Sequence, residues 1–272
     1  MLKTLVIICV IAFIVVYFTI SILKNLKTEM NSVQIDYSDP NVSPVSIKVA
    51  VIGDIHLREG EDITKFLKLL DEVKSNSPDL VLLVGDYITG IRRIKDIDSH
   101  RRSIIKTFKS LDPIPRAVVL GNHDNFTGRE KWFSEFKRLG VDVLENETRI
   151  MNIADVEVCI RGLGDYRSHR FKFVDYPAEC KNLPKITITH DPQGAFESGV
   201  EGLVFAGHTH CGQVSFPIIG PLKVPTKAPR AAICGLYKDS KRTLFVTSGV
   251  GTSIIPIRYG AQSQWDLIDL NF

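Results

Sequence analysis

The chain has 272 residues, of which 44% are hydrophobic and 24% are charged, and its formal net charge is +3 at pH 7. This balance is typical of a globular protein with one large domain or two small ones. Because a nucleic-acid-binding protein needs a strongly basic face, the small net charge predicts no nucleic-acid partner. The five cysteines form an odd set without a CxxC pair, which predicts free thiols rather than a disulfide framework or a zinc ribbon.

The first segment of the chain is strongly apolar. Nineteen residues, 5–23, with the sequence LVIICVIAFIVVYFTISIL, carry no charge. A helix of this length matches a hydrocarbon core of roughly 30 Å. We therefore predict a single-pass membrane anchor over residues 1–27 rather than a cleavable signal peptide, which would have a shorter apolar core. Lysines flank both ends of the segment, and their count favours a cytoplasmic catalytic domain in the cell membrane.

A polar stretch with two prolines follows and lacks periodicity, which predicts a linker over residues 28–45. Residues 46–272 alternate between β-branched runs and amphipathic stretches, so we expect one α/β domain there. Apolar residues at three- and four-residue steps predict helices near 63–73 and 129–139. The predicted strands are 47–52, 80–84, 116–120, 185–189 and 202–206, with shorter ones at 141–145, 156–162, 243–249 and 265–270.

The five longest strand runs each end in residue types that hydrophobic burial cannot explain. These residues are Asp54, His56, Asp86, Asn122, His123, Asp124, His190, His208 and His210. Ligand sites of open α/β sheets lie beyond the carboxyl ends of the strands, so these side chains can converge. Asp, Asn and His are suitable ligands for two divalent metals. The alternative, hydrogen-bonded polar groups without a ligand, does not account for five strand ends at once.

The spacing within these segments supports a common pocket. Residues two apart in an extended segment project to the same side and are separated by about 6.5 Å. Asp54 with His56, and His208 with His210, can therefore each face one site. The glycines that precede the polar residues fit sharp exits from the strands and a close approach of the backbone to an anion.

The segments GDIH, GDY, GNHD, THD and GHTHCGQ, in this order, resemble the calcineurin-like metallophosphoesterase superfamily. GHTHCGQV and SGVGTSIIPIRYG are similar to its bacterial membrane-associated phosphodiesterase branch. The resemblance implies a β-sandwich flanked by helices, with a dimetal centre at one edge. One metal would be held by Asp54, His56 and His210, the other by Asn122, His190 and His208, with Asp86 bridging both. Mn²⁺ is the metal that the resemblance favours, and Fe and Zn are alternatives.

The resemblance also implies a mechanism. Hydroxide formed between the two metals would attack phosphorus, and His123 would act as the general acid that protonates the leaving group, with Asp124 orienting its imidazole. We interpret Arg258, in the segment IPIRYG, as an ordinary surface arginine, and binding of a substrate phosphate is the alternative. No GxSxG elbow or other paired nucleophile indicates covalent catalysis.

The sequence thus predicts a membrane-anchored dimetal phosphoesterase that cleaves a phosphodiester or pyrophosphate. A lipid-linked substrate, such as the UDP-diacylglucosamine type of lipid A biosynthesis, is a candidate because the anchor holds the site near a bilayer. A non-catalytic metal-binding scaffold and a phosphomonoesterase are the alternatives. Residues 92–109 contain seven Lys or Arg against two Asp. We interpret this stretch as a solvated helix flank, the alternative being contact with anionic membrane lipid.

Overall fold

The computed structural model of the chain describes residues 2–60, 63–90 and 94–272, and leaves aside the side chains of residues 2–6, 8–10, 13–14 and 17 in the first helix. The described helices are α1 (Leu2–Leu26), α2 (Ile63–Ser75), α3 (Ile97–Thr107), α4 (Asn122–Phe126) and α5 (Arg129–Arg138). The strands are β1 (Glu29–Asp36), β2 (Ser46–Ile52), β3 (Leu80–Leu83), β4 (Arg116–Val118), β5 (Glu147–Ile153), β6 (Val156–Gly162), β7 (Lys185–Ile188), β8 (Gly202–Ala206), β9 (Ser215–Phe216), β10 (Gly220–Pro221), β11 (Gly235–Lys238), β12 (Arg242–Val246) and β13 (Gln264–Asn271). Short 3-10 helices are η2 (Phe108–Leu111), η3 (Ala178–Cys180), η4 (Pro192–Phe196), η5 (His210–Gly212) and η6 (Arg230–Ala232).

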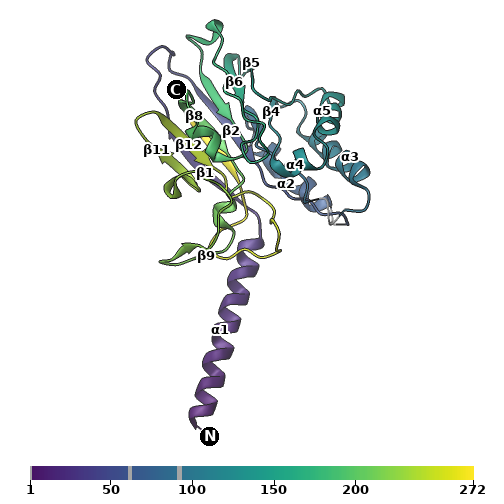
Figure 1. Cartoon of the computed structure of the whole chain (residues 1–272), viewed down its shortest axis with the longest axis vertical. Helices are drawn as coiled ribbons and strands as arrows, with labels where there is room; N and C mark the ends of the chain where they lie inside the picture. Colours follow the sequence, from purple (N-terminus) through teal and green to yellow (C-terminus); the bar gives the residue numbers. More distant parts are fainter. Residues whose placement is uncertain (1, 61–62, 91–93) are drawn as a thin grey trace.

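Two sheets form a sandwich. The first has five strands in the order β1-β13-β2-β3-β4, and the second has six in the order β11-β12-β8-β7-β6-β5. Alternate residues of β2 and β3, such as Val51 and Leu82, pack against Ile186 and Phe205 of the second sheet. The other face of the first sheet is covered by α2, α3 and α5 (Figure 1). This architecture confirms the predicted α/β sandwich flanked by helices.

The helices pack as their apolar periodicity predicts. Phe66, Leu70 and Val73 of α2 recur at three- and four-residue steps and are buried together with Trp132 of α5. A helix buries such a stripe most effectively against a flat sheet face. The short strand predicted at 141–145 is reduced to one isolated bridge, between Val143 and Val118.

The predicted linker over residues 28–45 is wrong for its first half, because Glu29–Asp36 forms strand β1. This strand pairs in parallel with β13 along its whole length. Ile35 is buried between the two sheets, and Asn31 donates a hydrogen bond to Asp266 at 2.7 Å. Polar residues alternate with the few apolar ones in β1, so the sequence contains no apolar run there. The strand still forms, because its backbone amides and carbonyls pair with those of β13 whatever the side chains are.

Helix α1 leaves the domain at one end and extends away from it (Figure 1). Within the described residues, no helix combines the length and the apolarity needed to cross a bilayer. The predicted anchor is therefore not confirmed, and several of its side chains lie outside the described part of the chain.

The prediction of free thiols is wrong for four cysteines. Cys159 on β6 is bonded to Cys180, and Cys211 on η5 is bonded to Cys234. Each pair is more than twenty residues apart in sequence, so no short spacing motif marks it. The side chain of Cys9 lies outside the described residues.

The basic stretch at 92–109 is solvated as expected at Lys95, Arg102, Lys106 and Lys109, which are exposed, but not at Arg101. Arg101 of α3 is only 2% exposed, and it donates hydrogen bonds to Asp98 and to the carbonyl of Thr127. Its guanidinium lies over the Trp132 ring at 5.3 Å, so it joins α3 to α5. Arg92 and Arg93 lie outside the described residues.

Candidate metal centre

Five strand ends meet at one edge of the sandwich. β2, β3 and β4 are parallel neighbours in the first sheet, and β7 and β8 are parallel neighbours in the second. Parallel strands place their carboxyl ends at the same edge. The segments that follow them carry all nine residues predicted from the sequence, and the structure brings these segments together.

A first group of possible ligands consists of Asp54, His56 and His210, all buried. The Nε2 atoms of His56 and His210 lie 3.1 Å apart. Oδ1 of Asp54 is 3.5 Å from Nε2 of His210 and 3.9 Å from Nε2 of His56. Three donor atoms therefore converge on one point, as the spacing of GDIH and GHTH predicts.

A second group consists of Asp86, His190 and His208, also buried. Nε2 of His190 lies 3.2 Å from Oδ2 of Asp86 and 3.2 Å from Nδ1 of His208. The same Asp86 oxygen is 3.5 Å from Nε2 of His56 in the first group. Asp86 thus stands between the two groups, where a bridging carboxylate would be needed.

Several buried polar atoms of these residues have no hydrogen-bond partner in the described chain, among them Oδ1 of Asp54 and Oδ1 of Asn122. Leaving such an atom unpaired costs roughly 1–3 kcal/mol. A cation coordinated by oxygen and imidazole nitrogen would satisfy these atoms, so the residues fit a pair of divalent metals.

Contacts behind the ligands set their orientation. Nδ1 of His190 donates to the carbonyl of Val84 at 2.8 Å, which turns Nε2 toward Asp86. Nε2 of His208 donates to the carbonyl of Pro225 at 3.0 Å, which leaves Nδ1 facing His190. Such outer contacts fix the ring of a ligand and its tautomer. The sequence could not predict the role of Pro225, because only its backbone oxygen contacts His208, and every residue type has that oxygen.

The backbone is strained at five of the seven predicted metal ligands. Positive φ angles, between 45° and 70°, occur at Asp54, His56, Asp86, His208 and His210. Non-glycine residues in this region cost of the order of 1–3 kcal/mol each, and such strain is concentrated at functional sites.

Two glycines allow the loops to approach so closely. A Cβ on Gly121 would lie 2.2 Å from Oδ1 of Asp86, and a Cβ on Gly207 would lie 2.5 Å from Oδ2 of Asp54. Both distances are far below contact, which explains why GNHD and GHTH begin with glycine.

His123 lies at the rim of the site and is half-buried. Its ring meets the His56 ring edge to face at 4.7 Å, and its backbone amide donates to Oδ1 of Asp86 at 2.8 Å. Together with His56 and Asp86 it forms a third group of possible ligands. Its place beside both groups also suits the predicted general acid.

The described contacts of Asp124 differ from the predicted one. Its carboxylate accepts hydrogen bonds from the backbone amides of Asp86, Tyr87 and Gly121, at 2.7–3.0 Å. The side chain therefore holds the loop that carries Asp86, and it orients His123 only through the backbone of α4.

Arg258 is neither a surface arginine nor available to a substrate. Its side chain is fully buried and donates to the carbonyls of Ser248, Gly249 and Gly251. Nη2 also lies 3.1 Å from Nδ1 of His210. The sequence did not predict this buried contact with His210, because an arginine in a loop is expected to be exposed to solvent unless the fold encloses it.

Burial controls the ionisation of the site. Desolvation lowers the pKa of His56 to about 3 and the pKa of His210 well below its ordinary value. Both rings are thus neutral and able to coordinate a metal. Desolvation raises the pKa of Asp54 to about 7. Burial also opposes the charges of Asp86 and His190, but their mutual attraction holds the pKa of Asp86 well below its usual range and that of His190 well above it.

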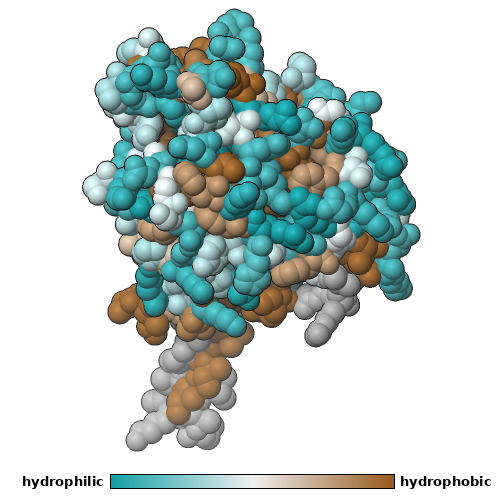
Figure 2. Space-filling view, turned by 45° about the horizontal axis from the view of Figure 1, so that its top comes forward, coloured by the Kyte–Doolittle hydropathy of each residue, from teal (hydrophilic) through white to brown (hydrophobic). Residues whose placement is uncertain are grey.

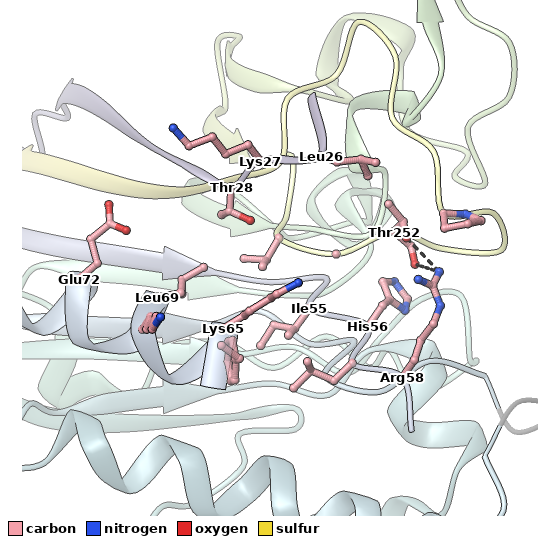
Figure 3. Close-up of a pocket in the computed structure, with 16 residues that line it drawn as sticks. Leu26, Lys27, Thr28, Ile55, His56, Arg58, Lys65, Leu69, Glu72 and Thr252 are labelled. Atoms are coloured by element: carbon pink, nitrogen blue, oxygen red, sulfur yellow. Dashed lines mark hydrogen bonds between the residues drawn. The ribbon is translucent and has the colours of Figure 1, made fainter. Parts of the chain in front are cut away.

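Two cavities adjoin the site. The larger, about 650 Å³, lies between the end of α1, α2 and the loop before β13 (Figure 3). Lys27, Lys65 and Arg58 line it, and Arg58 donates to Thr252 beside His56. Of the predicted site residues it contacts only His56.

The second cavity, about 460 Å³, contacts the metal-site residues more broadly. It extends from Asp86, Asn122, His123, His208 and His210 to Val214, Leu222, Pro225, Ile254 and Ile255. We call it the apolar groove. Since it opens directly on both ligand groups, it is the better candidate for the substrate.

The model of the calcineurin-like phosphoesterase family matches residues 47–212 of the chain, which carry every residue of the two ligand groups. The chain belongs to this family. Membership places it among the metal-dependent phosphoric ester hydrolases, which bind two divalent metals.

Two relatives illustrate the family's range. A Danio rerio protein called "Transmembrane protein with metallophosphoesterase domain" is 26% identical over 237 residues, covering 80% of this chain and 52% of the relative. Phosphodiesterase YaeI of Escherichia coli strain K12 is 26% identical over 236 residues, covering 85% of this chain and 83% of the relative. The chain thus spans about half of the first relative and most of the second.

The fold is similar to that of a solved structure, a 5'-nucleotidase precursor from Thermus thermophilus. The TM-score is 0.50 at 17% sequence identity, over 76% of this chain and 49% of that chain. At this identity the similarity concerns the fold alone.

Proposed function

We propose that this calcineurin-like phosphoesterase hydrolyses a phosphodiester or pyrophosphate bond at a dimetal centre. The observation that carries the proposal is the position of Asp86, whose Oδ2 lies within 3.5 Å of imidazole nitrogens in both ligand groups. A relative named as a phosphodiesterase favours a diester over a monoester.

Two divalent cations would be held by Asp54, His56 and His210, by Asn122, His190 and His208, and by Asp86 between them. Mn²⁺ is our first choice, because the resemblance to the family favours it. Fe and Zn are the alternatives, because nitrogen and oxygen ligands accept several transition metals and availability decides among them. When bound, the cations supply charge neutralisation at phosphorus and lower the pKa of water. His123, half-buried at the rim, delivers a proton to the departing oxygen.

We further propose that the enzyme is tethered to a membrane by its first 27 residues and acts on a lipid-linked phosphate, such as a UDP-diacylglucosamine-type lipid. The uncharged run over residues 5–23 supports the tether. The apolar side chains of the groove beside the ligand groups support a substrate with an apolar part.

For the orientation, the two disulfides favour the side of the membrane away from the cytoplasm, because disulfides persist in oxidising compartments. We give the disulfides more weight than the count of lysines around the first segment, which favoured a cytoplasmic domain and depends on few charges. The catalytic domain then faces the outside of the cell membrane.

The test uses the full chain purified in detergent and loaded with Mn²⁺. Turnover is measured on bis-p-nitrophenyl phosphate, p-nitrophenyl phosphate and a UDP-linked lipid, and we expect the diester or the lipid pyrophosphate to be preferred. Asp86→Asn should abolish turnover, whereas Asp266→Asn, at an equally buried carboxylate on β13, should retain it. Preference for the monoester would indicate a phosphomonoesterase, and metal binding without turnover would indicate a scaffold.

A further inference from the structure

Two segments beside the apolar groove expose large hydrophobic side chains. The β9–β10 hairpin carries Ile218, Ile219 and Leu222, which are 107%, 67% and 66% exposed. The loop before β13 carries Ile254, Ile255 and Ile257, of which Ile254 is 72% exposed. We call these residues, 214–222 and 253–257, the apolar rim. Outside α1, more than half of the exposed large hydrophobic side chains of the described chain lie in this rim.

The two segments are joined to each other. Gln213 donates hydrogen bonds through its side chain to the carbonyls of Ser253 and Ile255. The amide of Ser215 donates to the carbonyl of Tyr259 at 2.7 Å. These hydrogen bonds hold the two segments side by side. Because Val214, Leu222, Ile254 and Ile255 also line the groove, the surface of the rim continues into the candidate site.

The rim is linked to α1 through Tyr259, which lies two residues beyond its second segment. The Tyr259 ring contacts the Phe216 ring at 5.2 Å and stacks on the Phe18 ring at 5.1 Å. Figure 1 shows β9 and the last loop beside the end of α1 that joins the domain. Figure 2 shows hydrophobic residues gathered at the same end of the molecule.

The contact at Phe18 fixes the level of the rim along α1. Phe18 lies within the uncharged run of residues 5–23, five residues before its end, which corresponds to ~7.5 Å along a helix axis. Lys24 and Lys27 follow that end. The rim thus lies level with apolar residues of α1 rather than beyond its lysines.

The charge of the surrounding segments has one sign. Residues 213–234 and 249–263 contain no Asp or Glu, and the first includes the exposed Lys223 and Lys227. Exposed isoleucines bordered by lysines are typical of a surface that inserts into the interface of an anionic bilayer. If the rim bound a protein instead, its exposed isoleucines would have no reason to lie at the same height as the apolar residues of α1.

We propose that the apolar rim docks onto the lipid bilayer, so that the domain itself, and not only α1, contacts the membrane and the apolar groove opens toward the headgroups. The docking stands on the rim and its link to α1 through Tyr259, and it rests on the proposed membrane tether. Its consequence for catalysis, that the centre acts on phosphates at the bilayer surface, rests on the proposed phosphoesterase function.

The test places tryptophan in the rim of the full chain reconstituted in phosphatidylcholine–phosphatidylglycerol vesicles. Trp132 and Trp265 are fully buried, so background quenching by lipid is small. We expect phospholipids brominated in the acyl chains to quench Ile219→Trp and Ile257→Trp by roughly twofold or more. The matched control is Ile150→Trp on β5, an exposed isoleucine distant from α1, which should not be quenched.

A second measurement separates docking from activity. Ile218→Asn with Ile219→Asn, added to Ile257→Trp, should reduce the quenching while turnover of soluble bis-p-nitrophenyl phosphate stays unchanged. Asn suits the positive φ of 72° at position 218. If the rim tryptophans are quenched no more than Ile150→Trp, the proposal is overturned. Dimers in size-exclusion chromatography would then indicate that the rim binds a second copy of the chain. Absence of diester turnover in the parent protein would contradict only the proposed function.

Discussion

Nη2 of Arg258 lies 3.1 Å from Nδ1 of His210. The guanidinium is buried behind a predicted metal ligand, and its other hydrogen bonds fix the loop that follows β12. That loop in turn is tied to the Asp54 backbone, because the amide of Gly251 donates to the Asp54 carbonyl at 2.7 Å. One side chain therefore supports two predicted ligands of the first group.

Arg258→Lys should weaken metal binding without removing a ligand. Lysine keeps the charge but offers one nitrogen where arginine offers three, so several carbonyls lose their donor. We expect metal affinity to fall by roughly 10–100-fold, measured by titrating metal into the chelator-treated protein. Arg161→Lys, at an equally buried arginine bonded to Thr187, is the control. Unchanged affinity in Arg258→Lys would contradict the positioning role.

His123→Ala should retain both metals, because the ring stands beside the two groups rather than within either. Turnover of an alkyl diester, whose leaving group needs a proton, should fall by roughly 10²–10⁴-fold. Turnover of a p-nitrophenyl ester should change much less. His169→Ala, in an exposed loop, is the control, and equal alkyl-diester turnover in His123→Ala would refute the assignment.

Metal binding should release more protons at pH 6 than at pH 8. Burial raises the pKa of Asp54 to about 7, so in the metal-free protein this carboxyl is protonated below pH 7 and must lose its proton to coordinate. We expect affinity to rise with pH up to about 7 and to depend less on pH above it.

Calorimetry in two buffers of different protonation enthalpy measures the released protons. The difference between pH 6 and pH 8 should be about one proton and should vanish in Asp54→Asn. His56, with a pKa of about 3, contributes nothing at either pH. A pH-independent release would contradict the raised pKa of Asp54.

The four paired cysteines should resist alkylation in intact cells until a reductant is added. Mass spectrometry of the alkylated protein counts the modified thiols. In a domain on the cytoplasmic side, these cysteines would instead be alkylated without reductant. That result would contradict the proposed orientation.

The same cysteines contribute to stability. Replacing Cys159 and Cys180 by Ala should lower the free energy of unfolding by roughly 2–4 kcal/mol, because the reduced chain regains loop entropy. Urea denaturation measures this change.

Much of the site could be predicted from sequence, because each ligand directly follows an apolar strand. Residues 202–206 form β8 within the predicted bounds, and the histidines after it reach the centre. Parallel strands bring their carboxyl ends together whatever their separation along the chain. The edge strand β1 was missed because only Val33 and Ile35 of its side chains contribute to the core between the sheets.

The sequence by itself determined the fold class and the residue types of the candidate metal ligands, since both follow from local patterns of apolar runs and polar strand ends. Tertiary structure alone decided which distant groups meet: Cys159 with Cys180, Arg258 with His210, Asp124 with the amide of Asp86, and Phe18 with Tyr259. These pairings depend on the path of the loops between the strands. A contact between residues far apart in the chain produces no periodic pattern of apolar residues in either segment, so the sequence does not reveal it.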